Sequence, residues 1–118
     1  MADSPAGTPG PAAPFPTRLK ADVVFAMLAD PVRRQLLETL AAGIPRGASS
    51  LAPGVSRRLD AALKHLTALR DASLVVTQDD PRDRRRQLYS LSPDITVRPT
   101  ERGQEIDFGC CVLRVGKP

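Results

Sequence analysis

Apolar residues recur every three or four positions in three stretches of the chain, a spacing typical of helices with one buried face. The spacing predicts a first helix from about Thr17 to Leu28. A second helix is expected to begin at Asp30-Pro31, because aspartate caps a helix and proline is tolerated in its first turn. A further helix is predicted over residues 57–70. Its apolar stripe comprises Leu59, Ala62, Leu63, Leu66 and Leu69.

The segments between and after these helices carry different patterns. A third helix starting at Ser49 or Ser50 is expected to last little more than one turn, since Pro53-Gly54 follows at once. Residues 74–77 and 87–91 read as two strands joined by a turn over 79–83. Beyond Pro93, β-type residues predict a second hairpin made of 95–100 and 105–114.

This order of elements predicts the fold class. Two helices leading into a basic hairpin is the order of a winged helix-turn-helix, which places one helix in the major groove of DNA. We therefore expect an α+β, mainly helical fold, a winged helix-turn-helix with a C-terminal β-hairpin. Residues 1–16 hold five of the twelve prolines and are interpreted as a disordered lead. The DNA-binding domain then spans 17–92, and 93–118 forms a dimerisation or sensory segment.

The basic charge of the chain is concentrated in one region. The formal net charge is +4, and eight of the seventeen Lys and Arg lie between Arg57 and Arg86. Such a cluster favours a polyanionic partner, although a merely solvated surface has the same composition. The sequence shows no signal-peptide pattern and no apolar run long enough for a membrane span, so we expect a cytoplasmic protein with no membrane partner.

Several of these segments resemble the ArsR-type winged-helix transcription regulators of bacteria. The resemblance rests on LADPVRRQLLETL, on KHLTALRDASLV and on LYSL, and it covers roughly residues 20–91. The wing DPRDRRR is also similar to that of MarR-type regulators. The resemblance implies a homodimer whose recognition helix contacts DNA through Lys64 and His65 and whose wing tip contains Arg84 and Arg85. Leu63 departs from it, because the family usually has a small hydroxyl residue there.

The candidate DNA-binding residues lie on the predicted helix 57–70 and on the wing. Those on the helix can reach base edges or phosphates. Those on the wing are expected on a turn, where they approach the sugar-phosphate backbone and set affinity and salt dependence. Arg33 and Arg34 are interpreted as partners of Asp30 or Glu38, and Asp83 as a brace for a neighbouring arginine. The complete candidate set is Arg57, Arg58, Lys64, His65, Arg82, Arg84, Arg85 and Arg86.

Cys110 and Cys111 are adjacent, and they are the two cysteines of the chain. Thiolates suit soft metals and metalloids, so a thiolate-bound ion or a redox response is one interpretation. However, neighbouring side chains of a strand point to opposite faces, which hinders two adjacent thiols from holding one ion. The alternative is structural, with Cys110 packed inward beside Phe108 and Val112 and Cys111 facing a dimer mate or another strand.

The sequence does not favour an enzyme. It contains a single histidine, no glycine-rich phosphate loop and no nucleophile placed with a base. The leading hypothesis is a dimeric, sequence-specific DNA-binding repressor that responds to a metal, a metalloid or thiol redox state. The alternative is a winged-helix protein-interaction module whose basic surface binds an acidic partner.

Overall fold

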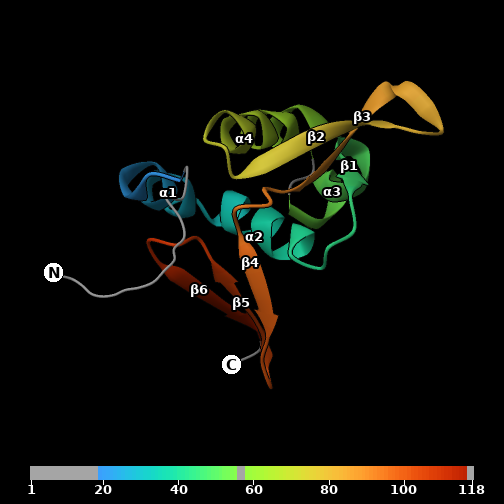
Figure 1. Ribbon diagram of the computed structural model, residues 1–118. Helices are drawn as coiled ribbons and strands as arrows, with labels where there is room; N and C mark the ends of the chain where they lie inside the picture. The colour runs from blue at the N-terminus through green and yellow to red at the C-terminus, as the bar shows by residue number, and fades with distance from the viewer. Residues whose placement is uncertain (1–18, 56–57, 117–118) are drawn as a thin grey trace, which may run out of the picture.

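The computed structural model describes residues 19–55 and 58–116, which form four helices and two three-stranded antiparallel sheets (Figure 1). This arrangement confirms the α+β winged helix-turn-helix class. The helices are α1 (Ala21–Leu28), α2 (Pro31–Leu40), α3 (Ala48–Val55) and α4 (Leu59–Asp71). The strands are β1 (Arg46–Gly47), β2 (Val75–Asp80), β3 (Asp83–Leu91), β4 (Thr96–Pro99), β5 (Gly103–Asp107) and β6 (Val112–Gly116). The proline-rich lead lies outside the described residues.

The start of α2 is confirmed at the Asp30-Pro31 pair. The Asp30 carboxylate accepts hydrogen bonds from the backbone amides of Val32, at 2.8 Å, and Arg33, at 3.2 Å. These amides are among the donors that a helix start leaves without a partner, so the side chain stabilises the first turn. Helix α1 begins at Ala21 with Lys20 as its N-cap, and Thr17, the predicted start, lies outside the described residues.

Helix α3 is longer than expected. It runs over eight residues with Pro53 inside it, whereas the sequence predicted little more than one turn. Proline removes one backbone donor, but Leu51 and Ala52 are buried in the same helix and it packs against α4. The prediction was wrong because this tertiary packing offsets the loss of one hydrogen bond.

Helix α4 buries a narrower stripe than the sequence predicted. Ala62, Leu66 and Leu69 are fully buried, whereas Leu59 and Leu63 are 47% and 38% exposed. The two exposed leucines lie on the side of α4 that faces β3 and the start of α3, where a groove separates the elements. The predicted burial of Leu59 and Leu63 was therefore wrong, because no element of the described chain covers that side.

The first sheet, with strand order β1-β3-β2, forms the wing. The β2–β3 hairpin turns through Pro81 and Arg82 and extends past the helices (Figure 1). Arg84, Arg85 and Arg86 consequently lie on strand β3, and their predicted place on the turn was wrong. Strand β1, which the sequence did not predict, pairs with β3 through Arg46 opposite Tyr89 and Gly47 opposite Leu88, and so joins the wing to the start of α3.

The second sheet, with order β4-β5-β6, includes the predicted C-terminal hairpin as β4 and β5. The expected strand 105–114 is instead two strands, because the chain reverses between Phe108 and Cys111. Gly109 has a φ of 88°, and the Phe108 amide donates to the Cys111 carbonyl at 2.9 Å. Glycine adopts such a positive φ without steric cost, which permits the tight turn.

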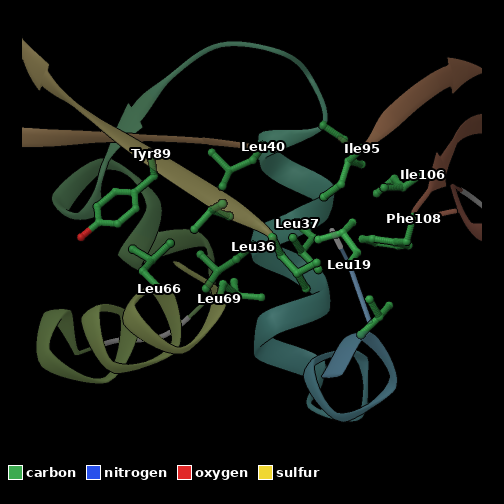
Figure 2. Close-up of a cluster of buried hydrophobic side chains, with 14 of the residues drawn as sticks. Leu19, Leu36, Leu37, Leu40, Leu66, Leu69, Tyr89, Ile95, Ile106 and Phe108 are labelled. Carbon is green, nitrogen blue, oxygen red and sulfur yellow. The ribbon is translucent and has the colours of Figure 1, made fainter. Parts of the chain in front are cut away.

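Both sheets share one hydrophobic core with the helices. Phe108 and Ile106 from β5 and its following turn belong to the same buried cluster as Leu66 and Leu69 of α4. In Figure 2, Phe108 lies beside Leu37 of α2, while Tyr89 of the wing lies on the opposite side of that helix. Helix α2 therefore stands between the two sheets. The Gln104 side chain adds a hydrogen bond of 3.1 Å to the Glu38 carbonyl.

Candidate nucleic-acid interface

A groove of about 370 Å³ lies between the start of α3, the N-terminal half of α4 and strand β3. The helices α3 and α4 form the helix-turn-helix pair, and β3 belongs to the wing, so this is the place where a DNA-reading surface is expected. Residues of all three elements line the groove. They include Ser49, Leu59, Leu63, Arg85, Arg86 and Tyr89.

The basic residues of α4 differ in their exposure and in the side chains that they contact. Arg58, the N-cap of α4, forms two hydrogen bonds with the Asp60 carboxylate, at 3.2 and 3.1 Å. Both side chains are more than 70% exposed, so solvent screens this pair strongly. Lys64 follows the groove-lining Leu63 in sequence and is exposed. Arg57 falls outside the described residues.

His65 points away from the groove. It is half-buried, and its Nδ1 lies 3.5 Å from Nη1 of Arg33 on α2. Lys64 and His65 therefore occupy different sides of α4, although they are adjacent in sequence. A direct DNA contact by His65 stays a prediction that this geometry does not favour.

Arg33 and Arg34 bind the end of α1, and their predicted pairing with Asp30 or Glu38 was wrong. Arg33 donates from Nε to the Met27 carbonyl and from Nη2 to the Ala26 carbonyl, each at 2.9 Å. Arg34 donates to the Leu28 carbonyl. The last carbonyls of a helix lack intrahelical donors and carry partial negative charge, so cations are favourable there.

The Asp30 carboxyl group titrates differently from an ordinary aspartate. Burial raises its pKa, but the backbone hydrogen bonds from Arg33 and Val32 and the nearby positive charges outweigh burial and lower the pKa overall. The aspartate that caps α2 is thus held in its charged form. This carboxylate also faces the pair formed by Arg33 and His65.

The arginines of the wing are arranged around its hairpin. Arg82 lies in the turn, where its amide donates to Asp80. The Asp83 carboxylate braces Arg85 through an ion pair of 3.2 Å, as predicted, and the hydrogen bonds from Arg85 lower the Asp83 pKa. Arg86 donates to the Ser49 hydroxyl at 2.8 Å, which connects the wing to α3. Arg84 is exposed, and within 19–55 and 58–116 no side-chain partner is observed for it.

The two cysteines lie in the turn between β5 and β6, not within a strand. Cys110 is exposed and Cys111 is half-buried against the core, the reverse of the predicted orientation. Their Sγ atoms are 3.9 Å apart, because the turn lets adjacent side chains approach each other. Burial, assisted by Cys110 and the negative charge of Asp107, raises the pKa of the Cys111 thiol to about 11.

These thiols do not fit a metal centre built by one chain. Among the described residues, no group of three or more His, Cys, Asp or Glu side chains is placed to hold a metal ion. Arg114, the basic residue nearest to the cysteines in sequence, forms an ion pair of 3.0 Å with Glu105. A thiol with a raised pKa is also a poor metal ligand, because the thiolate is the form that binds.

The comparisons with known proteins give matches in solved structures. No protein-family model matches the chain, and no curated protein matches it. A winged helix-turn-helix DNA-binding domain from Mycobacterium bovis, Mb0332, described as homodimeric and as a possible ArsR-family transcriptional regulator, is 27% identical with a TM-score of 0.53. An ArsR-like transcriptional regulator from Rhodococcus sp. RHA1 is 33% identical with a TM-score of 0.51.

A third match is the cadmium metal-sensor CmtR from Mycobacterium tuberculosis, 28% identical with a TM-score of 0.50. The three alignments cover 62%, 59% and 60% of this chain. The predicted resemblance is thereby confirmed. The chain shares the winged helix-turn-helix fold of these ArsR-family regulators.

The chain spans less than two thirds of the Mb0332 and Rhodococcus chains, 64% and 61%, and 70% of CmtR. Within the described ranges, no helix has the length and apolar character needed to cross a membrane.

The sequence analysis did not identify three residues that line the groove, Ser49, Leu59 and Leu63. No local pattern marks Ser49 as a groove residue. Its place beside Arg86 depends on the pairing of β1 with β3, which brings together two segments far apart in sequence.

Proposed function

We propose that this ArsR-type protein is a sequence-specific, DNA-binding transcriptional regulator that acts in the cytoplasm as a dimeric repressor and not as an enzyme. One observation carries the proposal: Arg85 and Arg86 of β3 line the groove beside α4, and the neighbouring Arg84 and the Lys64 of α4 are exposed. In this arrangement α4 enters the major groove, and the wing runs along the flanking backbone. The resemblance to transcriptional regulators in solved structures supports the same conclusion.

The two elements have different tasks in this proposal. Side chains of α4 face base edges and contribute sequence discrimination. Arg82, Arg84, Arg85 and Arg86 approach phosphates, where each contact releases counterions and adds affinity with little regard to sequence. Arg58 supplements them at the start of α4. His65 acts indirectly, by positioning α4 against Arg33 of α2.

A dimer is the second part of the proposal. Phe25 on α1 is 53% exposed, so a large aromatic side chain stands in water at a helix surface. Burying it against a second copy removes apolar area from water. Mb0332, which has a similar fold, is described as homodimeric. Two copies place two recognition helices on one face, so the preferred site is palindromic.

The signal is the third part of the proposal, and the thiol pair favours oxidation over metal binding. The exposed Cys110 reacts first with hydrogen peroxide, becoming a sulfenic acid as one water leaves, and the Cys111 sulfur then displaces a second water to form a disulfide between the Sγ atoms. The 3.9 Å separation of the Sγ atoms must shorten to a bond of about 2 Å. Because Cys111 packs against the core, this change displaces neighbouring core side chains.

A gel-shift assay with the promoter DNA upstream of the protein's own gene tests the proposal. It is run with reduced and with peroxide-treated protein, each against excess random duplex. A shift that survives the competitor supports a specific regulator, and its loss on oxidation supports the thiol signal. A shift that random duplex removes completely, together with binding to acidic polypeptides, would favour the protein-interaction module instead.

A further inference from the structure

Leu59 and Leu63 form an apolar patch in the middle of a basic surface. They are four positions apart in sequence, so both side chains lie on one side of α4, and both line the groove. Their exposed fractions of 47% and 38% contrast with the complete burial of Ala62 and Leu66 in the same helix. Packing in the core of the chain therefore does not account for the two leucines, which are left for a binding partner to cover.

The surroundings of the patch indicate the charge of its partner. Arg85 and Arg86 line the same groove from β3, and the exposed Lys64 follows Leu63 directly. The Arg85 side chain is 90% exposed even while it pairs with Asp83. An apolar centre with a cationic border complements a polyanion that carries an apolar group at a fixed distance from its charges.

Duplex DNA has this chemistry in its major groove. Phosphates border the groove, and thymine presents a C5-methyl group at its floor, while the other base edges present hydrogen-bonding atoms. The Cβ atoms of residues four apart on a helix are about 5–6 Å apart. That distance corresponds to roughly two steps along the duplex, since each base pair adds about 3.4 Å per strand.

We propose that Leu59 and Leu63 contact the C5-methyl groups of thymines, and that they thereby specify thymine at two nearby positions of each half-site. This inference rests on the proposed DNA-binding function and deepens it, because it names residues that select the sequence. Lys64 and the wing arginines supply affinity at the border. The leucines supply discrimination without a hydrogen bond.

The test uses the full chain and duplexes selected from a random-sequence pool. Each thymine of the selected site is then replaced in turn by deoxyuridine, which removes the methyl group and keeps the pairing edge. We expect the affinity to fall about threefold to tenfold at one or two thymines per half-site and to stay unchanged at the others.

Leu63→Ala and Leu59→Ala connect the loss to the side chains. Each variant should bind the thymine duplex more weakly and should lose sensitivity to deoxyuridine at one position. Val112→Ala is the matched control, because Val112 is 50% exposed on β6 in the second sheet. It should retain the full sensitivity. Thermal unfolding of each variant verifies that it folds.

The outcomes separate this inference from the proposed function. If a site is selected but deoxyuridine is neutral at every position, the inference is wrong and the DNA-binding function stands. Sensitivity that persists in both leucine variants would also overturn it. If no site is selected, both fail. Binding of a leucine-containing acidic peptide that Leu63→Ala abolishes would then assign the groove to a protein partner.

Discussion

Nη1 of Arg33 lies 3.5 Å from Nδ1 of His65, so one guanidinium group joins α4 to α2 and to the end of α1. The same guanidinium donates to the carbonyls of Met27 and Ala26. With Nδ1 accepting from Arg33, the neutral imidazole carries its proton on Nε2. The orientation of α4 thus depends on Arg33, a side chain that does not line the groove.

Arg33→Ala should lower the free energy of unfolding by about 1–3 kcal/mol, because it leaves the carbonyls at the end of α1 without their charged donor. Urea unfolding measures the difference. The matched control is Arg114→Ala, whose ion pair with Glu105 lies at the surface and contributes little. Equal unfolding midpoints for the two variants would contradict the role given to Arg33.

Asp30 predicts a dependence of stability on acid pH. Its pKa in the folded protein is below the ordinary value of 3.8, so its charged form stabilises the fold fully above that value. The contribution is lost as the pH falls below 3.8 and through the lowered pKa. Asp30→Ala should cost about 1 kcal/mol near neutral pH, and less in strong acid.

Unfolding curves of wild type and Asp30→Ala, measured from neutral pH to well below 3.8, check this expectation. Asp30→Asn is the control, because asparagine caps a helix without a charge. Asn should reproduce most of the wild-type stability near neutral pH. A difference between wild type and Asp30→Ala that grows toward low pH would have the wrong sign.

The double variant Arg84→Ala, Arg85→Ala should weaken DNA binding uniformly across sequences. It should also reduce the slope of log affinity against log salt by about two, roughly one for each phosphate that no longer has an arginine beside it. The control is the double variant Arg98→Ala, Arg114→Ala. It removes the same charge from the second sheet, where both arginines are ion-paired. Indistinguishable salt slopes for the two double variants would remove the wing from the interface.

Cys111 should be alkylated slowly in the folded protein. Its pKa of about 11, compared with an ordinary 9.0, reduces the thiolate fraction about a hundredfold at mildly alkaline pH. In a Cys110→Ser variant, iodoacetamide should modify Cys111 at least tenfold faster after unfolding in urea than before it. Mass spectrometry gives both rates. Equal rates would show that burial does not protect this thiol.

Local sequence signals predicted the parts of the fold that depend on neighbours along the chain. Asp30-Pro31 marks a helix start in any context, and the spacing of Leu66 and Leu69 gives the core side of α4. Strand β1 has two residues, too few for an alternation, and it exists because β3 pairs with it. The two strands β5 and β6 were merged because apolar residues continue through the turn at Gly109.

The sequence predicted which kinds of residue occur at the candidate site, but not how they are placed relative to one another. The basic cluster predicted exposed cations, and Arg85 and Arg86 line the groove, whereas DNA contacts by the candidate residues stay a prediction. Leu59 and Leu63 fit the helical repeat of the core, and periodicity cannot distinguish a buried leucine from one left uncovered. His65 was assigned to the same side as Lys64, although consecutive residues of a helix are about 100° apart.

The hydrogen bond from Arg86 to Ser49 and the pairing of β1 with β3 fasten the base of the wing to the start of α3. The hairpin therefore has a fixed position, and its angle to α4 is set before a duplex binds. A duplex that meets both elements has to bend or twist to suit that angle. The affinity for a site then also depends on how easily its DNA deforms, including at base pairs that no side chain contacts.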